Sequence, residues 1–475
     1  MKLRDVIGQI NFMEGRRSVM NDARRLVLGT AAQARKGQLG DQLRGMMEIE
    51  EKVNRETSSW LEPEEITDDG GVFDSCDLRV WLKMAEEAGV DYIPAKTILS
   101  VSEEDLSGLL GTIGMPENLT NNARKHLAKT VENDAELSEI RDNLPDPEPG
   151  PSHEHLVSVD AAMSDAMESI PPSWMVRTHL CGASNLKALV GTGLMLKGDD
   201  VAEIAPDVKL GAGWVQVGNR RTIDFKDTRF VEMGARGHKP VTHYLARPWE
   251  EPGRFHEGED IHRAGSPLAG PGKWPAEWRV FVKNGEVTGT ANYYGWTGEG
   301  ATPENAWNAI EAAGQAQKLI DHMVGLRLRG ETMDTVLLRS RKNDPQVEKA
   351  FESWDPTGLH ATLDFIEGAD GLKLLEGGPP HMIGAGGHPC AFAGQNVDPK
   401  DPARLVAACE GVAFLPMAHV SLGEPKTWVD GDPEDRIATF EQAVSLALDH
   451  AALSDDANAF LSRIGLVQDD DTPEP

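Results

Sequence analysis

The sequence predicts an α+β protein in which antiparallel strand pairs pack beside a long helix. Three stretches carry this prediction. Residues 274–294 alternate like two strands around an Asn284-Gly285 turn, the strongest short signal for a hairpin. Residues 303–325 show a helical apolar period after a proline. Residues 362–380 form a second strand pair with a glycine-rich turn.

Length and charge limit the function classes. The chain has 475 residues, enough for two or three domains and a substantial core. Its 77 acidic against 47 basic residues give a formal net charge of -30. Such an excess of negative charge argues against nucleic acid and against anionic membranes as partners.

The cysteines and the apolar pattern indicate the compartment. The cysteines are too far apart for a zinc motif or a disulfide framework, so we expect buried, reduced thiols at Cys76, Cys181, Cys390 and Cys409. No apolar run approaches the roughly 20 residues of a membrane span, and the first residues lack a secretory signal pattern. We therefore expect a soluble, cytoplasmic protein.

The first third of the chain reads as helices followed by a linker. Residues 1–88 are rich in helix formers and end in a helix over Cys76–Ala88. Residues 89–152 contain a short strand, a helix capped by Ser102, and a proline-rich acidic run at 142–152. That run is either a domain boundary or a long surface loop.

Residues 153–450 form the main predicted domain. After a helix over Val157–Glu168, a strand ends near Arg177, and the small-residue stretch before Lys187 is either a phosphate-binding loop or an ordinary turn. Strands are also expected near 215–225 and 240–249. A strand at Val412–Leu415 and a helix over about 433–450 follow, and 451–475 holds a helix end and an acidic tail that we expect to be disordered.

A Gly/Pro-rich stretch between Pro248 and Pro275 is predicted to be a loop. It carries several potential metal ligands, namely His256, Glu257, Glu259, Asp260 and His262. A metal site is one interpretation. A mobile loop that covers substrate is favoured, because loops of this length in compact domains tend to be functional.

Charged residues mark both strand pairs. On the first strand, Glu277, Arg279 and Phe281 share one face. In the second pair, Asp364 and Glu376 are expected to lie close together. Magnesium prefers oxygen ligands and is usually held by one or two carboxylates plus substrate phosphates, so the pair suits a nucleotide–Mg²⁺ site. The alternative is a hairpin with solvated acids at its rim.

The order of these elements resembles the carboxy-terminal half of ATP-grasp enzymes. A Glu-x-Arg-x-Phe-Val strand, a turn, a second strand, a long helix, an Asp strand and a Glu strand follow one another from Glu277 to Glu376. The resemblance implies two α+β lobes that hold a nucleotide between antiparallel sheets. It also implies ATP and Mg²⁺ as cofactors, with Asp364 and Glu376 as metal ligands.

The same resemblance implies roles for the basic residues. Arg279 is expected to be catalytic, and Arg177, Lys187, Glu277 and Arg279 are expected to bind ATP. Arg177 stands where the family usually has lysine, as in some divergent, phage-encoded members. A guanidinium binds phosphate through two parallel hydrogen bonds, so the exchange is chemically reasonable.

The implied activity is ATP-dependent ligation of a small-molecule carboxylate to an amine through an acyl phosphate. Family members commonly carry Asn two residues after the metal-binding Glu, whereas this chain has Gly378. That departure supports an alternative, a non-catalytic phage structural or assembly protein with virion partners, located in the host cytoplasm or the virion.

Overall fold

The computed structural model describes residues 59–102, 105, 152–171, 174–179, 194–197, 200–203, 208–211, 214–217, 220–223, 241–248, 250–259, 271–293, 301–330, 352–380, 410–413, 418–420, 425–427 and 437–467. The chain divides into two compact units. One comprises Met1–Ser59 and Lys96–Arg247, and the other comprises Trp60–Ala95 and Pro248–Pro475. The described residues mix helices with antiparallel and parallel strand pairs, which confirms the α+β class.

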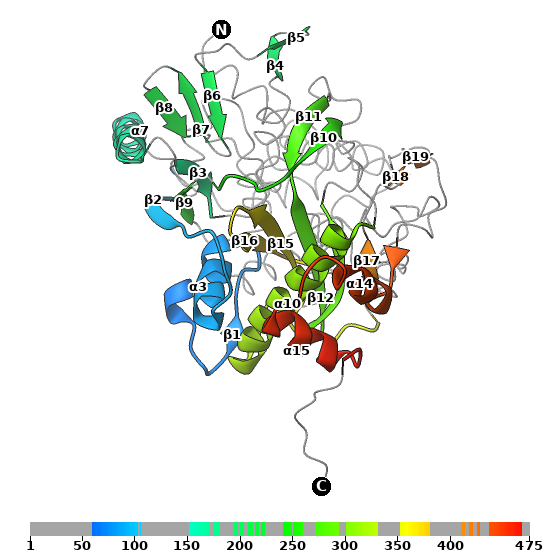
Figure 1. The fold of residues 1–475 in the computed structure, drawn as a ribbon. Coiled ribbons are helices and arrows are strands. Elements are labelled where there is room, and N and C mark those ends of the chain that lie inside the picture. The colour runs from blue at the N-terminus through cyan, green and yellow to red at the C-terminus, as the bar shows by residue number, and fades with distance from the viewer. Residues whose placement is uncertain are drawn as a thin grey trace, which may run out of the picture. The chain divides into compact units, whose positions relative to one another are not determined.

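A mixed sheet forms the centre of the second unit (Figure 1). Among the described residues it has six strands in the order β16-β15-β12-β13-β17-β20. Their bounds are Glu277–Lys283 for β12, Glu286–Asn292 for β13, Ala361–Gly368 for β15, Gly371–Gly378 for β16, Gly411–Ala413 for β17 and Ile437–Ala438 for β20. β13 and β17 are parallel, and the other neighbours are antiparallel.

Both predicted hairpins are confirmed. β12 and β13 join through Asn284 and Gly285, whose φ angles of 53° and 79° both lie in the left-handed region. Asn and Gly tolerate that region, and the resulting turn matches the twist of the strands. β15 and β16 pair from Thr362↔Gly378 to Gly368↔Gly371. The two hairpins lie side by side through β12 and β15.

The long predicted helix is present as α10, Pro303–Gly325. The Thr302 side chain accepts a hydrogen bond from the Asn305 backbone N–H, and Pro303 occupies the first turn, where no backbone donor is needed. The predicted apolar stripe is largely buried, including Ile310 and Leu319, but Val324 at its end is 47% exposed.

A second helix, α3 (Leu78–Ala88), covers the sheet beside α10. It begins at an Asp77 cap and ends at Gly89, which adopts the left-handed conformation. Trp81 on α3 packs directly over Gly377. The contact is so close that a Cβ at that glycine would lie only 2.3 Å from the indole. The helices therefore cover the sheet face on which Gly377 lies.

Two carboxy-terminal helices pack on α10. The helix predicted over 433–450 is shorter than expected, since Ile437–Ala438 is the edge strand β20 and α14 spans Phe440–Ala447. The separate helix α15, Asp455–Arg463, was not predicted. Glu311 on α10 accepts hydrogen bonds from the Ser454 backbone and hydroxyl at 2.7 and 2.6 Å, which fixes the start of α15.

The first unit contains small sheets and one described helix, α7 (His153–Glu168). The sheet orders are β2-β9-β3, β4-β5 and β6-β7-β8. The bounds are Lys96–Ser102 for β2, Trp174–Thr178 for β3, Leu194–Lys197 for β4, Asp200–Glu203 for β5, Val208–Gly211 for β6, Trp214–Val217 for β7, Arg220–Ile223 for β8 and Val241–Pro248 for β9.

The region predicted to be a loop between Pro248 and Pro275 contains a hairpin instead. β10 (Phe255–Glu259) pairs with β11 (Pro271–Pro275), so His256, Glu257 and Glu259 are strand residues. The remaining elements are η1 (Pro63–Glu65), β1 (Gly71–Val72), β14 (Leu328–Arg329), β18 (Ala418–Val420) and β19 (Pro425–Thr427).

Several predictions concern residues outside the described ranges. These are the helices before residue 57, residues 142–151 of the proline-rich run, Asp260, His262, Lys187 and the acidic tail. Cys76, the cysteine that falls in the described part, is buried as expected. In that part, no helix has the length and apolarity needed to cross a membrane.

Candidate functional site

Strand register brings Arg279, Asp364 and Glu376 into one row across the central sheet. Arg279 on β12 lies opposite Asp364 on β15, and Asp364 lies opposite Glu376 on β16. Side chains opposite one another in antiparallel strands project to the same face with Cβ atoms roughly 5 Å apart. The predicted closeness of the two acids is therefore present.

A bidentate ion pair between Arg279 and Asp364 forms the centre of the row. Arg279 Nε and Nη2 each donate to one Asp364 carboxylate oxygen at 2.8 Å. The side chains are only 13% and 5% exposed. The Tyr293 ring lies 4.2 Å from Arg279 Cζ, a cation–π contact that holds the guanidinium plane. Asp364 is thus not a solvated acid at the rim of a hairpin.

The electrostatics favour a permanently charged guanidinium. Burial acts to lower the pKa of Arg279, but the electrostatic interactions with Asp364, Tyr293 and Glu376 and the hydrogen bonds to Asp364 raise it above its usual value. Glu277, two residues earlier on β12, is also buried, at 1% exposure. Asp364, Glu376 and Glu277 therefore place three carboxylates beside one guanidinium on this face of the sheet.

We call Glu277, Arg279, Asp364 and Glu376 the charged face. Successive side chains along β15 point to opposite sides of the sheet, and this alternation shows on which side the charged face lies. Asp364 points to the opposite side from Leu363 and Phe365, which are completely buried. Leu363 pairs with Gly377, on which Trp81 of α3 packs. The charged face thus lies on the side away from α3.

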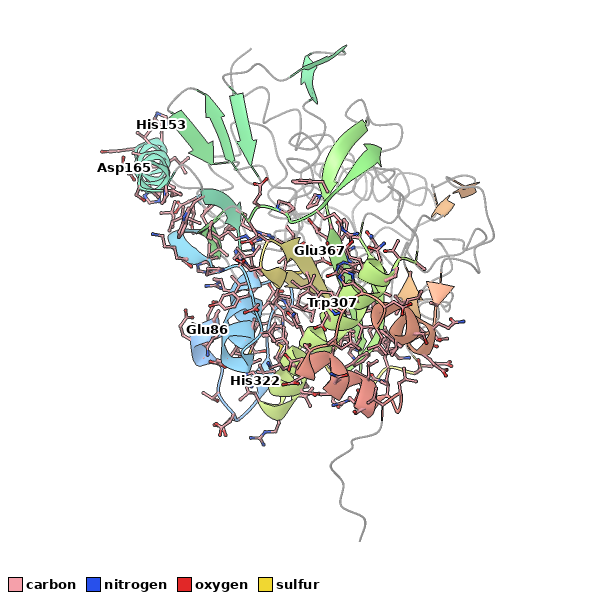
Figure 2. The ribbon with its side chains drawn as sticks, viewed as in Figure 1. Glu86, His153, Asp165, Trp307, His322 and Glu367 are labelled. Atoms are coloured by element: carbon pink, nitrogen blue, oxygen red, sulfur yellow. The ribbon has the colours of Figure 1, made fainter. Side chains whose placement is uncertain are left out.

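The opposite face has its own buried acid, which sequence reasoning missed (Figure 2). Glu367 accepts hydrogen bonds from Trp278 Nε1 at 2.7 Å and from Arg254 at 2.8 and 3.1 Å. Arg254 also donates to Asn305 in the first turn of α10, at 2.7 Å. This network ties β12 and β15 to α10, and nothing in the sequence around Arg254 indicates it.

The row does not include the other residues that the sequence singled out. Arg177 is on β3 of the first unit and is 4% exposed. Lys187 falls outside the described residues. Gly378, where the family resemblance expects Asn, lies opposite Thr362 at the end of β16. A Cβ there would have one described atom within reach, the Thr362 carbonyl oxygen at 4.0 Å.

The first unit has a polar cluster of its own that sequence reasoning also missed. The rings of His179 and His243 meet edge to face at 5.1 Å, and His179 Nδ1 accepts from the His243 backbone N–H at 3.1 Å. His243 Nδ1 in turn lies 2.8 Å from the Ser100 hydroxyl. These contacts link β9 to β2 and to the end of β3.

Protein carboxylates on the charged face do not form a complete metal cage. Across the described ranges, no three His, Cys, Asp or Glu side chains gather into a metal-binding group. A divalent cation would therefore need oxygen atoms from elsewhere, as Mg²⁺ commonly takes from water and phosphate. Comparisons of the sequence with protein-family models and with curated proteins give no match.

Proposed function

We propose that the chain is an ATP-dependent carboxylate–amine ligase of the ATP-grasp type, which binds ATP with Mg²⁺ at the charged face. One observation carries the proposal: the register that places Arg279, Asp364 and Glu376 side by side on neighbouring strands. An arginine paired to one carboxylate and flanked by another suits a polyphosphate with a divalent cation, since both signs of charge are needed there.

The residues fit a magnesium ion by the chemistry of their donor atoms. Both Asp364 oxygens accept from Arg279, but an ionised carboxylate has about four lone-pair sites, so acceptor capacity remains for a cation. Glu376, directly opposite, is half-buried and adds further oxygen donors. When bound, the ion would neutralise phosphate oxygens during transfer.

The chain's own contribution is positioning and charge. Arg279, held by Asp364 and Tyr293, would present its remaining N–H groups to phosphate oxygens. In the proposed reaction, a substrate carboxylate oxygen attacks the γ-phosphorus, the bond to the bridging oxygen breaks, and ADP leaves. The amine nitrogen then attacks the acyl carbon, phosphate leaves, and the nitrogen loses a proton to solvent.

A second candidate is a non-catalytic ATP-grasp-like protein of a phage particle or its assembly. It is favoured by Gly378, which offers no side-chain ligand, and by the closed geometry of the Arg279–Asp364 pair. The two satisfied hydrogen bonds of the Arg279–Asp364 pair are also the geometry of a purely structural ion pair.

Turnover separates the two candidates. ADP formation would be followed with ATP, Mg²⁺, a panel of small carboxylates and hydroxylamine, which traps an acyl phosphate as a hydroxamate. The ligase proposal expects hydroxamate and ADP in equal amounts, and loss of both in Glu376→Gln. Asp370→Asn, in the exposed turn of the same hairpin, is the matched control and should retain full activity. Binding of ATP without any turnover would favour the second candidate.

A further inference from the structure

A buried hydroxyl, that of Thr362, lies next to Asp364 and Glu376 on the charged face. Thr362 precedes Asp364 by two positions on β15, so both side chains project to the same side of the sheet. Thr362 is 3% exposed, and its Oγ1 has no hydrogen-bond partner among the described residues. Burying a hydroxyl without a hydrogen-bond partner costs free energy. A ligand bound to this oxygen would offset that cost.

Gly378 on the neighbouring strand lies beside that hydroxyl. Gly378 pairs with Thr362 as Glu376 pairs with Asp364, so the glycine lies on the same face. Its φ is not in the left-handed region, and a Cβ there would touch only the Thr362 carbonyl oxygen, at 4.0 Å, within the described structure. Neither backbone strain nor packing against described residues therefore requires glycine at this position.

The adjacent glycine, Gly377, has a different environment on the other face of the sheet. A Cβ at Gly377 would lie 2.3 to 2.6 Å from three atoms of the Trp81 indole, so packing demands glycine there. The two glycines thus differ in their surroundings. Gly377 admits a tryptophan on the helix side, whereas no described side chain lies within 4 Å of a Cβ at Gly378 on the side of the carboxylates.

We propose that Thr362 Oγ1 is an oxygen ligand of the divalent cation held by Asp364 and Glu376. A threonine hydroxyl is an established type of ligand for Mg²⁺. It would add a third protein oxygen to a site that two carboxylates leave incomplete. This inference rests on the proposed Mg-ATP site, and it names a residue that the strand motif alone does not indicate.

The test compares two threonines. Thr290 is also completely buried and its Oγ1 also has no partner among the described residues, but it lies opposite Val280, which belongs to the other face of the sheet. Full-length variants Thr362→Val, Thr362→Ser and Thr290→Val would be titrated with Mn²⁺ in the presence of a non-hydrolysable ATP analogue. Protein-bound ion would be followed by electron paramagnetic resonance.

The inference expects Thr362→Val to weaken Mn²⁺ binding about tenfold, equivalent to about 1.4 kcal/mol. Thr362→Ser and Thr290→Val should stay within about twofold of wild type. Both valine variants should unfold at or above the wild-type temperature without metal, because each removes an unpartnered hydroxyl. If Thr362→Val does not fold, Thr362→Ala gives the same comparison against Thr362→Ser.

Two outcomes would overturn the inference, and they are distinguishable. If Asp364→Asn abolishes Mn²⁺ binding while Thr362→Val leaves it unchanged, the proposed cation site stands and Thr362 is not its ligand. If wild type itself shows no protein-bound Mn²⁺, the proposed function fails together with this inference.

Discussion

The Arg279 guanidinium and the Asp364 carboxylate meet across β12 and β15 through two hydrogen bonds of 2.8 Å. Few exposed ion pairs contribute measurably to stability, but this one is nearly excluded from solvent. Breaking a buried pair by removing one partner typically costs about 3–5 kcal/mol, because the other charge is left uncompensated. The pair is therefore both a structural contact and the centre of the proposed site.

Arg279→Lys keeps the positive charge but removes the bidentate hydrogen bonding to Asp364. We expect it to lower the free energy of unfolding by about 1–2 kcal/mol, because one charged hydrogen bond is lost. We also expect a smaller rise in Tm on adding Mg-ATP than in wild type. Thermal unfolding with and without Mg-ATP measures both. A variant that gains the full nucleotide-induced stabilisation would exclude Arg279 as an important ATP contact.

Neighbouring glycines should respond differently to the same change. Gly377→Ala pushes a methyl group into the Trp81 indole and should cost about 1–3 kcal/mol or more. Gly378→Ala meets no described atom closer than 4.0 Å and should stay within about 1 kcal/mol of wild type. Urea unfolding of both variants gives the comparison. Equal losses would mean that the two glycines are not distinguished by packing against Trp81.

The sequence predicted the fold well where the spacing of apolar residues and the residue types at turns and helix starts agree. The Asn284-Gly285 turn, the Thr302-Pro303 helix start and the alternation around Arg279 and Asp364 specify local structure, and the observed elements follow them. The pairing of β12 with β15 brings together residues far apart in the sequence, such as Arg279 and Asp364, which are separated by 85 positions, and only the order of the elements suggested it.

Other features had no local signal. The partnership of Arg254 with Glu367 and the packing of Trp81 on Gly377 depend on tertiary contacts between distant segments. The helix predicted to start near 433 was wrong at its beginning because Ile437–Ala438 pairs with β17, and strand pairing overrides helix propensity at a sheet edge.

His360 should make stability depend on pH. Burial lowers its pKa below the ordinary 6.5, although the Asp355 carbonyl and carboxylate act to raise it. Its Nδ1 accepts from the Asn284 backbone N–H at 3.1 Å, so protonation would break that bond. Because the unfolded state binds the proton more readily, stability should fall as pH drops from about 6.5 towards the lower folded pKa.

The corresponding variant is His360→Asn. Its free energy of unfolding should show a weaker decline than wild type between about pH 6.5 and 5, and the difference between the two curves should be flat above about pH 7. Chemical unfolding at a series of pH values measures this. Parallel curves over the whole range would rule out His360 as the titrating group.

Gly314 should be required for docking of the carboxy-terminal helix. A Cβ at this position would lie 2.6 Å from Ala457 backbone atoms, so Gly314→Ala should separate α10 from α15 at a cost of about 1–3 kcal/mol. Gly325, at the end of the same helix, has no described atom within 4 Å of a Cβ and is the control. Gly325→Ala should be neutral, and a similar loss in both variants in thermal unfolding would contradict the packing argument.

Calorimetric titration of ATP into the full chain, with excess Mg²⁺ and then with EDTA, tests the central claim most directly. We expect saturable binding with Mg²⁺ and at least tenfold weaker binding with EDTA. Glu376→Gln should reduce the gap between the two conditions, and Asp370→Asn should preserve it. Circular dichroism at the titration temperature would confirm that each variant is folded. Binding of equal strength with and without Mg²⁺, or no binding at all, would contradict the assignment of the charged face as a Mg-ATP site.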